Sequence, residues 1–314
     1  MISLLVKRIF KSNTIMAIKN ILCRILGRLG VTKNHWPAYL LEYANMQLYK
    51  QKQGYQFDLC RPKLFTEKIQ WYKTRFKHPD LVRYVDKYLF KSLIEEKLGG
   101  GYTIPIFDAW TSVDAFREAW TSLPEKFCLK STLQSDGKFI KVINKADTDI
   151  DELCVEVSEW LKPKNLLINS FCSAYYKAVP RILAEEYMES VKGQLYDYKF
   201  FCFGGKPYCV YAASEHFQDE FYPISFYDLE WKQLDVQYGN HRNDFIPKPL
   251  HFNEMKEIAL KLSKGFPFIR VDFFDTINKL YVAELTFYPG GGLTPYHPVE
   301  FNESLGSMLN LKRN

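Results

Sequence analysis

One stretch near the C-terminus, residues 268–287, decides the fold; it reads FIRVDFFDTINKLYVAELTF. Apolar and polar residues alternate on both sides of a polar segment, as in two antiparallel strands joined by a turn. Alternation with a period of two places the apolar residues of each strand on one face. The expected apolar face comprises Ile269, Val271 and Phe273 in the first strand and Tyr281, Ala283, Leu285 and Phe287 in the second.

The polar face of this hairpin carries two acids that oppose each other. A turn centred near Asn278 places Asp272 opposite Glu284 and Arg270 opposite Thr286. Directly opposed residues have Cβ atoms about 4.5–5.5 Å apart, where like charges destabilise the pair. Either one acid is protonated or a cation lies between the two. Oxygen ligands of this kind suit Mg²⁺, so we predict a metal site; the alternative is two solvated acids screened by basic neighbours.

Helical periodicity dominates the chain before residue 100, and strand-like alternation dominates after it. The expected early helices lie at roughly 36–52, 66–77 and 80–98, the second capped by Thr66. Later helices are expected at Val113–Trp120, Glu152–Lys162 and Phe252–Lys264. The other β-like runs are Tyr102–Asp108, Phe127–Ser131, Phe139–Ile143, Arg181–Met188, Tyr196–Phe203, Pro207–Ala213 and Ile224–Tyr227. We therefore predict an α+β fold with mainly antiparallel sheets.

The composition indicates a globular chain without a membrane span. The 314 residues are 47% hydrophobic, 25% charged and 16% aromatic, so the chain can bury a sizeable core. No run of 18 apolar residues occurs, which excludes a conventional membrane-spanning helix. The seven cysteines are odd in number and form no C-x-x-C pair. We therefore expect neither a disulfide framework nor a zinc site, and we predict a cytoplasmic location.

Positive charge is concentrated at the N-terminus. Residues 1–41 contain seven basic residues and no acid, which leaves 35 basic against 36 acidic residues in the rest of the chain. A neutral body disfavours nucleic-acid binding. Apolar residues recur at helical spacing between Ile15 and Leu29, which predicts a basic amphipathic helix within residues 1–34. Such a helix favours contact with an anionic membrane surface; the alternative is packing on the body with the charges in water.

Several stretches resemble a known family. Arg270-Val-Asp272 and Glu284-Leu-Thr286, followed by Pro289-Gly290, are similar to the Mg²⁺-binding signature of the ATP-grasp superfamily. More closely, roughly residues 60–310 resemble the TupA-like ATP-grasp family of polysaccharide biosynthesis. The matching stretches are LFTEKIQW (64–71), AEEY (184–187), DYKFFCF (197–203), FYD (226–228), LSKGFPF (262–268) and ELTF (284–287).

The resemblance implies an ATP-grasp fold in which two α+β subdomains hold a nucleotide between them. The basic N-terminal helix at residues 1–34 lies outside the resemblance, and a helical region is expected at 35–100. The first subdomain is then expected at 101–189 and the second at 190–314.

The resemblance also implies roles for individual side chains. The expected nucleotide-binding residues are Lys130 at the phosphates, Glu185, Tyr187 and Met188 around adenine, and Asp197 at the ribose. Because the phosphate loop is poor in glycine, Ser135 and Lys138 are expected to supply side-chain donors to phosphate in place of a backbone nest. The expected catalytic residues are Arg270 and Lys199, and the expected Mg²⁺ ligands are Asp272, Glu284 and Thr286. The chain departs from the pattern at Thr286, where the signature has Asn, and in the phosphate loop Ser131–Lys138, which has one glycine.

The activity implied is that of an ATP-dependent carboxylate–amine ligase in surface polysaccharide biosynthesis, with ATP and Mg²⁺ as cofactors. The expected partners are a uronic-acid carboxylate on a sugar or glycan and an amine such as an amino acid. An N-terminal helix on the inner face of the membrane would suit a lipid-linked glycan. Two alternatives remain open. Asp147-Thr-Asp149 has the Asp-x-Asp pattern of some glycosyltransferases, although a helix cap also explains it, and a non-catalytic relative would tolerate the glycine-poor loop.

Overall fold

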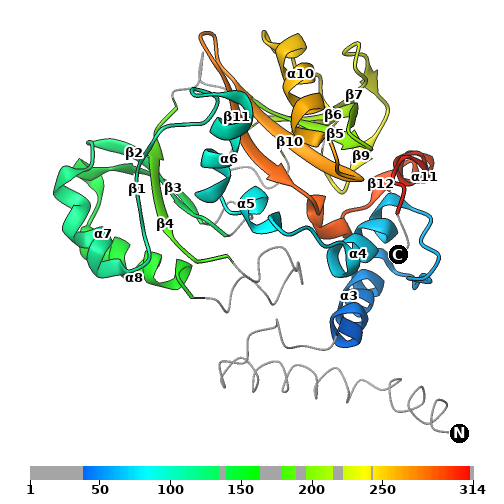
Figure 1. The fold of residues 1–314 in the computed structure, drawn as a ribbon, viewed down its shortest axis with the longest axis horizontal. Coiled ribbons are helices and arrows are strands. Elements are labelled where there is room, and N and C mark those ends of the chain that lie inside the picture. The colour runs from blue at the N-terminus through cyan, green and yellow to red at the C-terminus, as the bar shows by residue number, and fades with distance from the viewer. Residues whose placement is uncertain are drawn as a thin grey trace, which may run out of the picture.

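The computed structural model describes residues 38–133, 139–162, 178–188, 196–214, 222–241 and 243–311. The described chain forms a four-stranded and a six-stranded antiparallel sheet, which lie on opposite sides of the molecule in Figure 1. The predicted α+β fold with mainly antiparallel sheets is confirmed. The expected helix within residues 1–34 lies outside the described residues.

The smaller sheet has its own apolar core. Its strands, in spatial order, are β1 (Ile106–Trp110), β4 (Ile182–Glu186), β2 (Lys126–Ser131) and β3 (Ile140–Asn144). Helices α7 (Val113–Ala119) and α8 (Ile150–Trp160) pack on it (Figure 1). Its core is formed by large side chains that include Trp110, Phe116, Phe127 and Trp160. This sheet carries Lys130 and Glu185.

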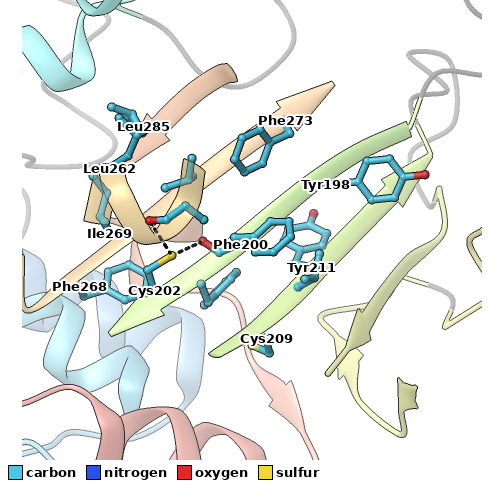
Figure 2. Close-up of a cluster of buried hydrophobic side chains, with 14 of the residues drawn as sticks. Tyr198, Phe200, Cys202, Cys209, Tyr211, Leu262, Phe268, Ile269, Phe273 and Leu285 are labelled. Carbon is cyan, nitrogen blue, oxygen red and sulfur yellow. Dashed lines mark hydrogen bonds between the residues drawn. The ribbon is translucent and has the colours of Figure 1, made fainter. Parts of the chain in front are cut away.

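The larger sheet is the scaffold of the acidic hairpin. Its strands, in spatial order, are β11 (Leu280–Thr286), β10 (Phe268–Asp275), β5 (Tyr196–Phe203), β6 (Lys206–Ser214), β7 (Ile224–Tyr227) and β8 (Gln233–Leu234). Helix α10 (Phe252–Ser263) packs across β5, β6 and β10. Figure 2 shows the resulting core, with Leu262 of α10 beside Phe200, Cys202, Ile269, Phe273 and Leu285 of the sheet. A short pair, β9 (Gln237–Tyr238) and β12 (Tyr296–His297), lies beside it.

Helices from the two ends of the chain join this second core: α4 (Phe65–Arg75), α5 (Leu81–Val85), α6 (Leu89–Leu98) and α11 (Val299–Met308). Helix α3 (Ala38–Gln53) packs against α4. Helix α4 contacts α3, α11 and the turn η6 (Pro289–Gly292), whereas α5 and α6 contact β11. In Figure 1 α5 and α6 lie between the two sheets.

Two expectations about the early helices are wrong. The helix expected at 80–98 is broken into α5 and α6, because Asp86 Oδ1 accepts the N–H groups of Tyr88 (2.9 Å) and Leu89 (3.2 Å) and starts a new helix. Thr66 does not cap α4, which begins at Phe65. Glu67 Oε2 instead accepts the N–H groups just before the helix, and the Thr66 hydroxyl lies buried against Tyr49 and Asn302.

The hairpin has the predicted register at its acidic end. Asp272 pairs with Glu284 and Arg270 with Thr286. A β-bulge follows, because Phe273 pairs with Val282 and leaves Ala283 as an extra residue. The bulge reverses the alternation of β11, so Leu280 and Val282 are buried with Leu285. The prediction that Tyr281 shares the apolar face is therefore wrong, since it lies opposite Phe274 on the other face.

Gly306 lies where α11 packs closely against the start of α4. A Cβ atom added there would lie 2.3 Å from Lys63 O and 2.9 Å from Phe65 N, which are backbone atoms that cannot rotate away. We expect Gly306→Ala to lower the free energy of unfolding by about 2–3 kcal/mol, measured by urea denaturation. Gly100→Ala is the control, because its nearest neighbour would be a side-chain oxygen 3.9 Å away. Equal stability of the two variants would contradict this packing.

No helix in the described ranges is long and apolar enough to cross a membrane.

Candidate active site

One face of the larger sheet gathers most of the charged residues singled out in the sequence. The β5–β10–β11 register pairs Lys199 with Asp272 and Asp272 with Glu284. Directly paired residues point to the same side of a sheet, as do residues two apart in one strand. Arg270, Asp197 and Thr286 therefore share this side. The opposite face is covered by α10.

Asp272 is the centre of this cluster and is 1% exposed. Arg270 binds it with both arms of the guanidinium, Nε to Oδ1 at 2.7 Å and Nη2 to Oδ2 at 2.5 Å. Arg270 Nη2 also donates to Thr286 Oγ1 at 3.1 Å. Lys199 Nζ donates to Asp272 Oδ2 at 3.4 Å and forms an ion pair with Asp197. Bidentate pairing fixes the plane of the guanidinium as well as its position.

Burial and pairing act in opposite directions on these groups. Burial lowers the pKa of Arg270 and of Lys199, but the neighbouring carboxylates outweigh it and leave both pKa values raised. Burial raises the pKa of Asp197 more than Lys199 lowers it. Burial also raises the pKa of Glu284, but the opposite effect of Lys87, Arg270 and Lys199 is larger. The pKa of Glu284 is therefore lowered overall. The two cations therefore stay charged at neutral pH.

Protein cations compensate the negative charges of the two opposed acids of the hairpin. Lys87 Nζ lies 3.7 Å from Glu284 Oε1, while Arg270 and Lys199 hold Asp272. Among the described residues, no three His, Cys, Asp or Glu side chains gather into a group able to hold a metal. Two carboxylates and the Thr286 hydroxyl nevertheless fit Mg²⁺, which takes one or two carboxylates and fills its shell with phosphate oxygens and water.

A second charged cluster lies on the smaller sheet. Glu185 Oε1 is 2.6 Å from Lys130 Nζ, and its other oxygen forms an ion pair with Lys91 of α6. Lys91 Nζ also donates to Ile104 O at 2.6 Å. Burial raises the pKa of Glu185, but the two lysines outweigh burial and lower it to about 2. One buried carboxylate thus holds two ammonium groups side by side.

The depressed pKa of Glu185 predicts acid sensitivity. The ionised carboxylate stabilises the folded state above the unfolded pKa of 4.5, and this contribution is lost as the pH falls through about 2. We expect the stability difference between wild type and Glu185→Gln to shrink by about 3 kcal/mol from about pH 5 to about pH 2, as measured by urea denaturation. Glu156→Gln, at an exposed pair with Lys141, is the control. A difference that does not change with pH would contradict the pairing.

A cavity of about 500 Å³ lies where the end of β4 faces the tip of the acidic hairpin. Its wall includes Glu186, Tyr187 and Met188 on one side, and the turn Thr276–Lys279 with Tyr281 on the other. Lys126 Nζ lies 3.9 Å from the centre of the Tyr187 ring. The bulge in β11 turns Tyr281 into this cavity, so the cavity depends on both sheets.

Two buried polar atoms beside the charged clusters are among those that lack a hydrogen-bond partner in the described part of the chain. They are Asp197 Oδ1 and Ser131 Oγ, the latter next to Lys130. An unpartnered buried acceptor costs about 1–3 kcal/mol, so such atoms call for a ligand or water. Of the predicted phosphate-loop residues, Ser135 and Lys138 lie outside the described part of the chain.

The structure brings the predicted residues into two groups. Arg270, Asp272, Lys199, Asp197, Glu284 and Thr286 share one face of the larger sheet, while Lys130, Glu185, Tyr187 and Met188 lie on or just after strands of the smaller one. Sequence reasoning missed Lys87 and Lys91. The sequence does contain a signal for Lys91, which lies among the apolar residues Phe90, Leu93 and Ile94. A lysine on an apolar helix face needs a buried acid as its partner.

Comparison with known proteins gives a family match and a set of similar solved structures. A family model described as TupA-like ATPgrasp matches residues 67–310. Similar solved structures include N5-carboxyaminoimidazole synthetase from Staphylococcus aureus complexed with ADP, with 17% identity and a TM-score of 0.38, covering 65% of this chain and 44% of that one. D-Alanine-D-Alanine ligase from Helicobacter pylori has 17% identity and a TM-score of 0.39, covering 72% and 61%.

The chain spans less than two thirds of the length of each of these two solved chains. None of the curated proteins compared with the chain matches it. The family match extends over most of the sequence, including both charged clusters, and the resemblance found in the sequence is confirmed: the chain belongs to the TupA-like ATP-grasp family.

Proposed function

We propose that the protein is an ATP-dependent carboxylate–amine ligase that acts in surface polysaccharide biosynthesis. The observation that carries this proposal is the single sheet face on which Arg270 and Lys199 hold Asp272 beside Glu284. Paired acids and fixed cations are what phosphoryl transfer requires, since its catalysis is mostly positioning and charge stabilisation.

ATP is proposed to lie between the two charged clusters. Its base would enter the cavity beside Tyr187 and Met188, near Glu185. A ribose hydroxyl would donate to Asp197 Oδ1, which has no other partner among the described residues. Lys130 would contact the phosphates, as would Ser135 and Lys138 of the phosphate loop. Lys91, which is paired with Glu185, would provide a second ammonium group to neutralise the phosphate charge.

Asp272, Glu284 and Thr286 are the proposed Mg²⁺ ligands. When bound, the ion would neutralise phosphate charge on the leaving and transferred groups. Binding requires Asp272 to give up part of its contact with Arg270, which lies 2.5–2.7 Å away. The Arg270 guanidinium is then available to pair with an equatorial oxygen of the transferred phosphoryl group, and Lys199 with a phosphate or the acceptor carboxylate.

The proposed reaction needs no covalent bond to the protein. A carboxylate oxygen of the acceptor attacks the γ-phosphorus, the bond to the β–γ bridging oxygen breaks, and ADP leaves. The resulting acylphosphate is attacked by an amine, which forms an amide and releases phosphate and a proton. The side chains of Arg270 and Lys199 orient the reactants and stabilise the developing negative charge.

The test is ADP release from ATP in the presence of Mg²⁺, a uronic-acid sugar and a set of amino acids. The acceptor carboxylate is labelled with oxygen-18, because an acylphosphate route transfers one labelled oxygen to the released phosphate. Labelled phosphate together with an amide product is the expected result. Failure of the chain to bind ATP or ADP at millimolar concentration would remove the basis of the proposal.

The glycosyltransferase alternative rests on Asp147-Thr-Asp149. Asp149 Oδ1 accepts the N–H groups of Asp151 (2.7 Å) and Glu152 (3.2 Å), and so caps α8. Asp147 Oδ2 accepts from Asn144 Nδ2 at 2.5 Å. Both acids have local structural tasks, which disfavours a metal–sugar-nucleotide site. Binding of a UDP-sugar without binding of ATP would reverse this ranking.

A non-catalytic relative is the remaining alternative, because the phosphate loop has only one glycine. Nucleotide binding without ADP release in the presence of acceptors would favour it. The proposed location is the cytoplasm, and the basic residues of segment 1–34 support contact with the inner face of the membrane.

A further inference from the structure

The acidic hairpin leads directly into a loop with unusual backbone geometry. The ladder between β10 and β11 ends at Arg270 and Thr286, and the turn η6 (Pro289–Gly292) begins three residues later. Gly290, Gly291 and Gly292 all have positive φ, at 55°, 61° and 65°. Glycine adopts such angles without strain, but it has more conformational freedom than any other residue, so outside contacts are needed to hold this loop in one shape.

Those contacts come from α4, more than 200 residues earlier in the chain. Gln70 Nε2 donates to Gly291 O and to Gly292 O, both at 2.9 Å. Lys73 Nζ donates to Gly291 O at 3.1 Å and to Gln70 Oε1 at 3.2 Å. Gln70 and Lys73 are both 0% exposed. A buried ammonium and a buried amide therefore hold two consecutive loop carbonyls.

The loop is also enclosed by close packing. A Cβ atom at Gly292 would lie 2.6 Å from Gln70 Nε2 and 2.8 Å from Ile69 Cβ. One at Gly290 would lie 2.3 Å from the Tyr238 hydroxyl. At Gly290 and Gly292 the loop backbone thus fits between α4 and β9 with no room for a side chain.

We propose that Gln70 and Lys73 are positioning residues of the active site. By fixing the carbonyls of the glycine loop, they hold the end of β11, so that Glu284 and Thr286 stay in register opposite Asp272 and Arg270. Loss of contacts made directly to metal ligands typically changes metal affinity by about 10–100-fold, and the anchors act on the ligands through the loop, so we expect an effect near the lower end. The role in metal binding rests on the proposed function, whereas the anchoring of the loop does not.

Helix α4 offers a matched control for the experiment. Lys68 also donates to two backbone carbonyls, Gly306 O at 2.7 Å and Leu309 O at 2.8 Å, but these belong to the C-terminal helix and its end. Lys68→Met and Lys73→Met therefore remove the same kind of contact from the same helix, and only the second affects the glycine loop.

Two readouts test the proposal on the full chain. Hydrogen exchange of the peptide covering residues 287–294 is expected to be about 10-fold faster in Lys73→Met and unchanged in Lys68→Met. Mn²⁺, used in place of Mg²⁺ and followed by electron paramagnetic resonance, is expected to bind the ADP complex of Lys73→Met about 10-fold more weakly. ADP affinity without metal stays within about twofold of wild type, because the base, ribose and lysine contacts lie elsewhere.

If Lys73→Met fails to fold, Gly292→Ala is the second variant. Its Cβ would push the loop away from Gln70, so we expect the same faster hydrogen exchange and the same weaker Mn²⁺ binding. If the wild type binds Mn²⁺ and ADP but Lys73→Met matches Lys68→Met in both readouts, the inference is overturned and the proposed function stands. If the wild type binds neither ADP nor Mn²⁺ at millimolar concentration, the proposed function fails and the role of the anchors in metal binding fails with it.

Discussion

Asp272→Asn is expected to lower Mg²⁺-dependent ADP release by roughly 10³-fold. The carboxylate is the one acid of the cluster held by both Arg270 and Lys199, and it opposes Glu284 across the hairpin. An amide removes one negative charge, is a weaker ligand for Mg²⁺, and leaves two buried cations with less compensation. Steady-state ADP release and Mn²⁺ binding are the measurements.

Asp275→Asn is the matched control for this prediction. Asp275 lies on the same strand but on the opposite face, where its Oδ1 is 2.5 Å from His251 Nδ1 at the start of α10. Loss of the contact between Asp275 and His251 should lower the free energy of unfolding without reducing kcat per folded molecule. If Asp275→Asn and Asp272→Asn lose the same activity per folded molecule, the charged face of the sheet is not the reaction centre.

Arg270→Lys is expected to lower kcat by roughly 10²-fold or more while the KM for ATP changes only a few-fold. Lysine keeps the positive charge but has no planar fork, so it cannot bind both oxygens of Asp272 and reach Thr286 at once. The same loss of geometry applies to a transferred phosphoryl group, whose charge Arg270 is proposed to stabilise. An effect on kcat with little change in KM is the signature of a contact made in the transition state.

Arg83→Lys is the control for the arginine substitution. Arg83 Nη2 pairs with Glu96 Oε2 at 2.7 Å on the surface, so its replacement should leave both kinetic constants unchanged. Arg270→Lys with wild-type kcat would show that the guanidinium serves only to neutralise Asp272, and the proposed role in catalysis would be withdrawn.

Local patterns predicted most of the elements and the acidic pairing. Alternation with a period of two predicted β5 and β7 with their observed bounds and the pairing of Asp272 with Glu284. These features depend on residues close in the sequence, where periodicity and turn chemistry dominate. The same argument failed at Ala283, because a bulge shifts the phase without leaving a mark in the composition of the strand.

The surroundings of the acids depend on contacts that no local pattern encodes. The sequence argument called for either a protonated acid or a cation at Asp272 and Glu284, and in the structure Arg270, Lys199 and Lys87 compensate the two carboxylates. Lys87 comes from the break between α5 and α6, nearly 200 residues before Glu284. Gln70 and Lys73 reach the glycine loop across a still longer separation. Such partners meet only when the whole core is packed.

The amino-acid order was thus enough to establish the α+β class, the opposed carboxylates and the family, because alternation and short motifs are local properties. Which cations compensate those carboxylates, how Tyr281 turns into the cavity and what holds the glycine loop follow from packing. A buried charge must be paired, and the groups within a few ångströms of it come from distant parts of the sequence. Its partners are therefore decided by the packing of the whole core.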